Sequence, residues 1–414
     1  YTGVTLALPA LMFRRILRGR SLAEQFLMCY TFGNFYIINI VFLLQLLHIS
    51  NFFTLAGLTA VLSIVIGGRV NRIPLKQQAG NTWHLFGKLL RGRIKSAIFL
   101  FLGKCAAGIK RLAKFFYRHI VKNPIQSMLL LGIGVCLCWI YGRQIILVYG
   151  YRASDIPVHM SWINEMSRGK IFAKGVYPFG FHCMIYYLHA VFRFDTYVIL
   201  CQFFFAQVIF MHLVLLAMLK QLCKTKYIPY IGTFVFLLGN FWSGQTYSRF
   251  YATLPQEFGM IFVIPSIYFL IRFFQIPKQK LADKETRLTL QCFAMAFYGT
   301  MIAGLCCIGI ACGFCFRFLR KEYFRRIMFT GICSVFLAVL PMGIAFATGT
   351  PLQGSLGWGL SVINGGKSSS STETEADEAE TLKVSTGDDK NTVRVGKPDG
   401  TVMEIDVSDL PSAQ

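Results

Sequence analysis

Residues 197–219 read YVILCQFFFAQVIFMHLVLLAML, and this run contains no Asp, Glu, Lys or Arg. A helix needs about 20 apolar residues to cross a bilayer, so the run is long enough to span one. Comparable runs occupy residues 26–48, 52–67, 125–149, 228–242, 258–274, 288–316 and 327–347, and a shorter one occupies 2–13. The pattern predicts an all-α bundle with many membrane-spanning helices.

The charge balance agrees with a membrane protein and argues against a nucleic-acid binder. Hydrophobic residues make up 55% of the 414 positions and charged residues only 15%, while the net charge is +23. The Lys and Arg residues lie in blocks between the apolar runs, at 14–20, 69–122, 220–226, 278–287 and 317–326. Cytoplasmic loops carry such an excess, so we predict contact with anionic lipids and no contact with nucleic acid.

The chain divides into four regions. We predict leading transmembrane helices at 1–67, a basic amphipathic segment with interfacial helices at 68–124, a transmembrane core at 125–363, and an acidic linker with the start of an extracytoplasmic domain at 364–414. Alternating residues on both sides of Pro398-Asp399-Gly400 predict a β-hairpin in the last region. Because the chain opens on Tyr1 inside an apolar run, we interpret the sequence as truncated at its N-terminus.

Two apolar segments do not fit a simple count of crossings. Residues 179–192 are too few to span a bilayer, which favours a re-entrant or surface helix. The run at 288–316 begins and ends at basic loops, so we predict a helical hairpin broken at Gly299, Gly304 or Gly309. Irregular backbone at membrane depth needs protein or a water-filled cavity around it, and both segments therefore favour a cavity in the bundle.

Acidic residues are scarce before the C-terminal region, and their positions indicate a site. No Asp or Glu occurs from 26 to 154, and Asp155 then begins an expected surface helix over 154–168. On a helix, Asp155 and His159 share a face. An ionised carboxylate at the membrane edge is a candidate general base. A cap formed by Ser154 or Asp155, with His159 on the surface, fits the same pattern, and the sequence leaves both interpretations open.

The residues after this helix add further candidates. The stretch Tyr177-Pro178-Phe179-Gly180-Phe181-His182 predicts a sharp bend, because Pro178 fixes φ and Gly180 frees it. The bend directs His182 either towards Asp155 or into the bundle. Glu165 faces the same cleft or the solvent. We therefore include Glu165, Tyr177 and His182 as candidate substrate-binding residues.

A second polar loop lies between the runs at 228–242 and 258–274. It carries Gln245, Tyr247, Arg249 and Glu257, which we include as candidate substrate-binding residues. A guanidinium binds phosphate through two parallel hydrogen bonds, and a tyrosine ring can pack on a sugar. An interfacial aromatic belt, with the arginine reaching the head groups, explains the same residues equally well.

The sequence gives weak support for a metal. Asp155, His159, Glu165 and His182 offer oxygen and nitrogen donors, but their spacing matches no tight ligand motif. We therefore predict no metal ligands and leave a divalent cation open as a cofactor. The cysteines at 306, 307, 312 and 315 lie in an apolar stretch, where small residues favour close helix packing.

The order of these motifs resembles that of the integral-membrane GT-C glycosyltransferases. A basic stretch and one span precede the Asp155-x-Pro157-x-His159 helix, and Tyr177-Pro178-x-Gly180-x-His182 follows. The resemblance is closest to large Gram-positive, actinobacterial-type members of uncertain substrate, and it covers about residues 125–363. The chain departs from that pattern in its extra leading spans and in lacking a second acid beside Asp155.

The resemblance implies a multispanning bundle with an outward cavity and a role in cell-envelope glycan synthesis. The donor would be a polyprenyl-phosphate-linked sugar, and the acceptor an extracytoplasmic envelope glycan. Asp155 would correspond to the catalytic base and Arg249 to the contact with the lipid phosphate. His159 or His182 would orient Asp155 or bind the sugar.

Two other classes of protein remain as alternatives. A transporter or flippase of envelope precursors also uses broken helices and an outer cavity, but it usually needs ionisable residues near the midplane. A non-catalytic envelope-assembly protein would use the C-terminal region instead. An outward cavity that holds Asp155 and Arg249 together favours transfer, a continuous path through both leaflets favours transport, and the absence of a cavity favours assembly.

Overall fold

The computed structural model describes residues 1–72, 121–147, 150–275 and 284–354, the isolated positions 103, 110 and 117, and the strand residues 383–386, 392–396 and 402–406. The chain forms two compact units, Tyr1–Gln353 and Gly354–Gln414. Most of the predicted interfacial segment at 68–124 lies outside the described residues, as does the predicted acidic linker. Residues 68–71 form the last turn of a helix that is a candidate membrane span, and Arg72 is its C-cap.

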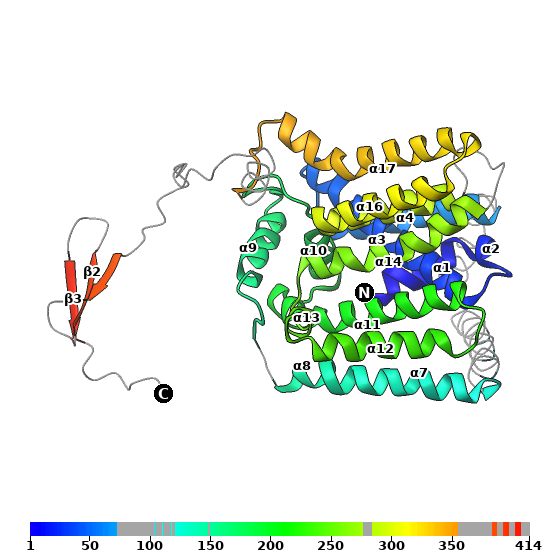
Figure 1. The fold of residues 1–414 in the computed structure, drawn as a ribbon. Coiled ribbons are helices and arrows are strands. Elements are labelled where there is room, and N and C mark those ends of the chain that lie inside the picture. Colours follow the sequence, from blue (N-terminus) through cyan, green and yellow to red (C-terminus); the bar gives the residue numbers. More distant parts are fainter. Residues whose placement is uncertain are drawn as a thin grey trace. The chain divides into compact units, whose positions relative to one another are not determined.

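The described part of the first unit is helical throughout (Figure 1). Its elements are η1 (Gly3–Ala7), α1 (Leu8–Met12), α2 (Arg14–Leu17), α3 (Leu22–Leu46), α4 (Phe52–Asn71), α7 (Pro124–Leu137), η3 (Cys138–Gly142), α8 (Arg143–Leu147), α9 (Ile156–Ser167), α10 (Gly180–Phe192), α11 (Thr196–Leu222), α12 (Ile228–Trp242), α13 (Gly244–Phe250), α14 (Pro255–Gln275), α15 (Lys284–Gly299), α16 (Met301–Phe318) and α17 (Lys321–Ala347).

Among the described residues, seven helices are long and apolar enough to cross a membrane. They are α3, α4, the continuous stretch from α7 to α8, α11, α14, α16 and α17. Their bounds follow the predicted runs closely, because apolar length sets where a helix can span. The prediction of an all-α multispanning membrane bundle is confirmed.

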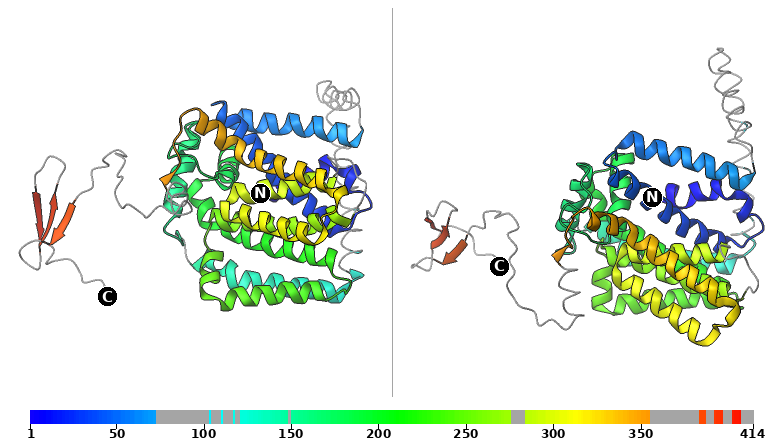
Figure 2. Two further views of the ribbon diagram at one scale, coloured as in Figure 1. Left: turned by 45° about the horizontal axis from the view of Figure 1, so that its top comes forward. Right: turned by 90° about the horizontal axis from the view of Figure 1, so that it is seen from above.

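The long helices lie alongside one another, so their termini gather at two ends (Figures 1 and 2). At the first, which we call the basic end, Gln221 donates to the hydroxyl of Ser21, and Lys284 lies 3.0 Å from Glu24. Arg326 reaches the Phe273 carbonyl there, at 3.0 Å. The basic residues near this end are Arg14, Arg15, Arg18, Arg20, Arg69, Arg72, Lys220, Lys224, Lys226, Lys284, Arg287, Arg317, Arg320, Lys321, Arg325 and Arg326. We call the opposite end, which contains Asp155, the site end.

The centre of the bundle is built from aromatic rings on helices far apart in sequence. Tyr30 on α3 stacks on Phe210 of α11, with centroids 4.8 Å apart, and on Phe262 of α14, at 5.4 Å. All three rings are buried in one hydrophobic core. The leading region therefore supplies α3 to the same core as the later helices.

Helix α10 does not cross the bundle. It begins with Gly180 against Tyr298, near the end of α15, where an added Cβ would lie 2.4 Å from the Tyr298 Cβ. It ends at Arg193, whose guanidinium lies 5.3 Å from the Phe52 ring at the start of α4. Both termini of α10 thus lie at the site end, which fits the expectation that the short run at 179–192 forms a re-entrant or surface helix and not a span.

The long run at 288–316 is divided between α15 and α16. The break falls at Gly299, and Thr300 caps α16 through its hydroxyl, which accepts from the Ile302 amide. A Cβ on Gly299 would lie 2.3 Å from the Cα of Gly259. The backbones of α14 and α15 therefore meet here at a distance that only glycine permits at these two positions.

The described backbone of the second unit is a three-stranded antiparallel sheet in the order β1 (Lys383–Thr386), β2 (Thr392–Gly396), β3 (Val402–Asp406). Thr392 pairs with Asp406 and Gly396 with Val402. These are the two segments that the sequence places on either side of the Pro-Asp-Gly turn.

Candidate functional site

Asp155 is the residue immediately before α9, at the site end. Its backbone is already helical, with φ −78° and ψ −15°, and its side chain accepts no hydrogen bond from the amides of the first turn. The Ser154 hydroxyl donates to its Oδ1 at 3.3 Å. The expectation that Ser154 or Asp155 caps this helix through its side chain is therefore wrong for Asp155, whose exposed carboxylate is left available.

His159 and His182 form a buried pair beneath this carboxylate. The Nδ1 of His159 and the Nε2 of His182 are 3.0 Å apart, so one ring donates and the other accepts. His182 is fully buried and His159 is 7% exposed, which excludes the interpretation of His159 as a surface residue. The fold brings the two rings together because α9 packs on the first turn of α10.

Burial keeps both imidazoles neutral. It lowers the pKa of His159 to about 4, although the negative charge of Asp155 acts in the opposite direction. Burial also lowers the pKa of His182 well below its ordinary value, and the neighbouring His159 adds to this. Asp155 therefore lies beside two uncharged rings and not beside an imidazolium at neutral pH.

Aromatic rings enclose the histidine pair. Trp162 lies 5.3 Å from the Tyr177 ring and stacks on Phe179 at 5.5 Å, and Phe179 lies 4.4 Å from His182. Burial raises the pKa of Tyr177, and the charge of Asp155 raises it further. Four of the predicted residues thus converge: Asp155, His159, Tyr177 and His182.

The loop that carries Tyr177 is held by a strand-like contact that the sequence did not predict. The Val176 amide donates to the Pro351 carbonyl at 2.8 Å, and the Gln353 amide donates to the Val176 carbonyl at 3.1 Å. Gly175 has φ +102°, and a Cβ there would lie 2.7 Å from the Cα of Gln353. The segment after α17 therefore fixes the backbone next to Tyr177.

Arg249 and Glu257 form a second polar group on α13 and α14. Arg249 Nε lies 2.6 Å from Glu257 Oε1, and its Nη2 donates to Gln256 Oε1 at 2.8 Å. The arginine side chain is 48% exposed and that of Glu257 only 9%. The residue expected to hold a phosphate is thus paired with an internal carboxylate, although its outer face remains open to solvent.

The other predicted residues lie outside these contacts. Tyr247 packs against the bundle, 5.6 Å from the Tyr141 ring, and its hydroxyl accepts from Gln144 at 3.4 Å. Glu165 forms an ion pair with Arg168 at 2.6 Å. Gln245 belongs to α13, but its side chain lies outside the described part of the structure.

Phe181 connects the two groups. Its ring lies 6.1 Å from His159 and 6.0 Å from Phe258, the residue after Glu257. Aromatic side chains of α9, α10 and α14 are therefore in contact between the histidine pair and the start of α14.

Arg152 is a cation near Asp155 in sequence that the sequence analysis did not consider. It lies three positions before Asp155, donates from Nη2 to the Gln144 carbonyl, and places its guanidinium 4.4 Å from the Phe204 ring centroid. Burial lowers the pKa of its guanidinium. The sequence did contain a signal for it, because Arg152 lies in the same short loop as Asp155.

The described residues do not fit a resident metal ion. No cluster of three or more His, Cys, Asp and Glu side chains occurs in the described part of the chain. The two histidines turn ring nitrogens towards each other, which removes those nitrogens as ligands. A divalent cation therefore finds no ready ligand set among these side chains.

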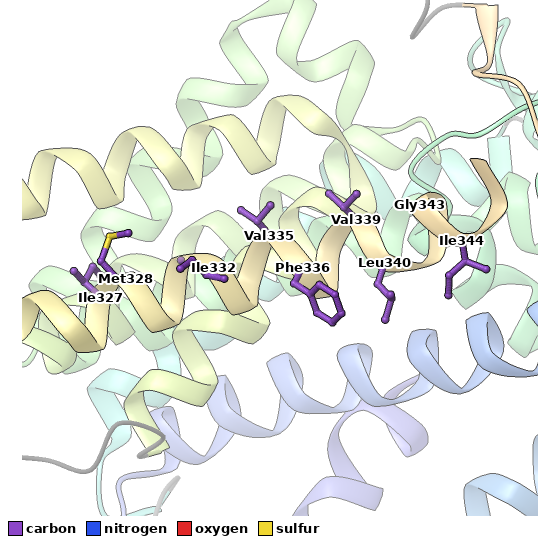
Figure 3. A pocket seen from close by; sticks show the side chains of 10 residues that line it. Ile327, Met328, Ile332, Val335, Phe336, Val339, Leu340, Gly343 and Ile344 are labelled. Atoms are coloured by element: carbon purple, nitrogen blue, oxygen red, sulfur yellow. The ribbon is translucent and has the colours of Figure 1, made fainter. Parts of the chain in front are cut away.

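An apolar groove follows α17, and Asp155 is not among its lining residues (Figure 3). Its volume is about 770 Å³, and it follows the helix from Ile327 to Ile344. Its lining contains no charged residue, so it can bind a hydrocarbon chain but offers no catalytic side chain. Its far terminus approaches the segment that pairs with Val176.

Comparisons of this chain with protein families, with curated proteins and with solved structures found no match. The fold and the site define a multi-pass membrane protein with a buried histidine pair at one end of its bundle, next to a carboxylate that has no ion-pair partner among the described residues.

Proposed function

We propose that this protein is a membrane glycosyltransferase that moves a sugar from a polyprenyl-phosphate donor to an extracytoplasmic acceptor of the cell envelope. One observation carries the proposal. Asp155 is exposed, caps no helix, and has no Lys or Arg within ion-pair distance among the described residues. A carboxylate held in this way at a membrane edge favours a role as a base.

The distribution of charge supports an outward orientation for this carboxylate. Most basic residues of the described bundle lie at the opposite end, and cytoplasmic loops are the ones enriched in Lys and Arg. The basic end then faces the cytoplasm, and Asp155 faces the compartment in which polyprenyl-linked sugars are used for envelope synthesis.

The proposed reaction needs one base and one cation. Asp155 accepts the proton of an acceptor hydroxyl, whose oxygen forms a bond to the anomeric carbon. The bond between that carbon and the phosphate oxygen breaks, and polyprenyl phosphate leaves with both electrons. Because its charge is stabilised by a cation, no acid is needed for the leaving group. Arg152 and the open face of Arg249 are the candidate cations.

The neutral histidines account for how Asp155 stays reactive. A charged imidazolium nearby would lower the basicity of the carboxylate. His159 and His182 remain uncharged because they are buried, so they orient the loop without forming an ion pair with Asp155.

The groove on α17 is consistent with a long isoprenoid donor. It is apolar throughout and lies on a membrane-spanning helix. Ile344, at its far terminus, precedes the segment at 350–353 that pairs with the loop of Tyr177. An isoprenoid in this groove would place its phosphate near the site end.

The test is the variant Asp155→Asn, with Asp195→Asn as its matched control. Asp195 also lies at the site end, but its carboxylate caps α11 by accepting from Tyr197 at 2.8 Å, and Asn is an equally good cap. We expect Asp155→Asn to lower the yield of glycan product in cells by about 10²- to 10⁴-fold at unchanged protein level, the usual contribution of a general base. Asp195→Asn should retain product. Equal yields in both variants would remove Asp155 from catalysis.

A further inference from the structure

A cavity of about 820 Å³ opens at the basic end, far from Asp155. The start of α3, the first half of α7, the end of α11 and Tyr230 of α12 line it. Its polar lining residues are Ser21, Asn123, Gln126, Ser127, Lys220, Gln221 and Tyr230, and its apolar ones are Leu22, Ala23, Met128, Leu130, Leu131 and Gly134.

The two kinds of lining are separated along α7. Asn123 and Gln126 lie at its start, whereas Leu130, Leu131 and Gly134 lie deeper in the bundle. At 1.5 Å per residue, the lining of α7 covers about 16 Å of helix. The cavity thus has a polar mouth at the basic end and an apolar shaft that points towards the membrane centre.

Lys220 supplies an uncompensated charge at the polar mouth. Its Nζ donates to the Tyr230 hydroxyl at 3.0 Å, and this hydroxyl donates to Gln126 Oε1 at 3.4 Å. No Asp or Glu within the described ranges lies at ion-pair distance from Lys220. The described bonds use one of the three N–H donors of this ammonium, so an anion at the mouth finds a cation oriented towards it.

We propose that this cavity binds one anionic phospholipid of the leaflet at the basic end. The phosphodiester lies at Lys220, and one acyl chain follows α7 from Met128 to Gly134. An apolar shaft on a membrane-facing helix admits hydrocarbon more readily than water, and a lysine without an acidic partner complements a phosphate. The lipid would lie between α7 and α3, both of which line the cavity. This site is independent of the proposed glycosyl transfer.

Two variants test the two halves of the site, each with a matched control. Lys220→Gln removes the charge at the mouth, and Lys224→Gln removes an exposed lysine of the same end that does not line the cavity. Gly134→Leu fills the shaft, and Gly132→Leu adds the same side chain on α7 outside it. A Cβ on either glycine meets no atom within 4 Å, so both leucine variants should fold.

The full chain is purified in a neutral detergent and titrated with phosphatidylglycerol, phosphatidylcholine or inorganic phosphate, with thermal stabilisation and native mass spectrometry as readouts. We expect saturable binding of one phosphatidylglycerol, weakened about tenfold or more in Lys220→Gln and Gly134→Leu, the size of one charged hydrogen bond or more. Lys224→Gln and Gly132→Leu should bind as the parent does. Equal affinity in all variants overturns the site, equal binding of phosphatidylcholine overturns the anionic headgroup, and Lys220-dependent binding of inorganic phosphate alone overturns the lipid.

Discussion

Asp155 and Glu257 lie at the same end of the bundle and have opposite surroundings. Glu257 is buried and held by Arg249 at 2.6 Å, whereas Asp155 is exposed and receives only the Ser154 hydroxyl at 3.3 Å. A buried carboxylate needs its partner for the fold to be stable. An exposed carboxylate without a partner contributes little to stability and is available for chemistry. The comparison teaches that pairing, and not mere position at the membrane edge, separates a structural acid from a candidate base.

The largest expected effect on stability comes from removing the partner of Glu257. We expect Arg249→Met to lower the free energy of unfolding by about 2 kcal/mol, less than for a fully buried pair because the arginine is half exposed. The melting temperature in detergent is the measurement. The double variant Arg249→Met/Glu257→Leu should recover most of the loss, and an unchanged melting temperature in the single variant contradicts a structural role for this pair.

The next effect concerns pH and the ring beneath Asp155. His159 has a folded-state pKa of about 4, below its ordinary value of about 6.5. The unfolded chain therefore binds a proton in this window and the folded chain does not, so stability falls as pH drops from about 6.5 to about 4.

We expect His159 to contribute about 1 kcal/mol of that loss between pH 7 and pH 5.5. Melting curves over this range are the measurement, and His159→Gln is the comparison. The variant should show a shallower slope than the parent. Parallel slopes would show that His159 titrates normally and is not held neutral in the folded protein.

The variant Asp155→Asn tests the other carboxylate of the comparison between Glu257 and Asp155. Because the carboxylate is exposed and caps nothing, we expect the free energy of unfolding of the variant to stay within about 0.5 kcal/mol of the parent's. Its melting temperature should therefore be nearly unchanged. The charge of Asp155 raises the pKa of His159, so the acid-induced loss in this variant should extend to slightly lower pH. A large drop in melting temperature would mean that Asp155 has a structural role instead.

The smallest effect is expected at Glu165. Its ion pair with Arg168 is exposed on the arginine side, and such pairs contribute between zero and about 1 kcal/mol. Glu165→Gln should therefore leave both the melting temperature and the glycan product nearly unchanged. A loss of product at normal protein level would return Glu165 to the site.

The sequence was sufficient for the spans and for the local geometry of α9. Apolar length determines where helices cross, and polar residues such as Ser21, Asn51 and Asp195 then extend each helix by a cap. The four-residue spacing predicted that Asp155 and His159 lie one helical turn apart, and the His159 amide donates to the Asp155 carbonyl at the start of α9. The break at Gly299 was one of three candidates, and the approach of Gly259 selects it.

The contacts between distant segments were beyond the sequence. His182 reaches His159 only because α10 turns back at the site end, and no local pattern specifies that path. The pairing of Arg249 with Glu257 was also beyond the sequence, because it depends on the path of the chain between α13 and α14. The contact of Val176 with Leu352 joins two residues that are far apart in the sequence. It too could be found only in the folded chain.

The meeting of Gly259 with Gly299 restricts how this lineage can change. Any replacement at either position pushes a carbon into the opposing backbone, and no adjustment at the other position can make room, since it already carries the smallest residue. Substitutions at most other positions of α14 and α15 should therefore be tolerated better than substitutions at Gly259 or Gly299. Two facing glycines on consecutive antiparallel helices, followed directly by a threonine cap, offer a sequence mark for recognising distant relatives.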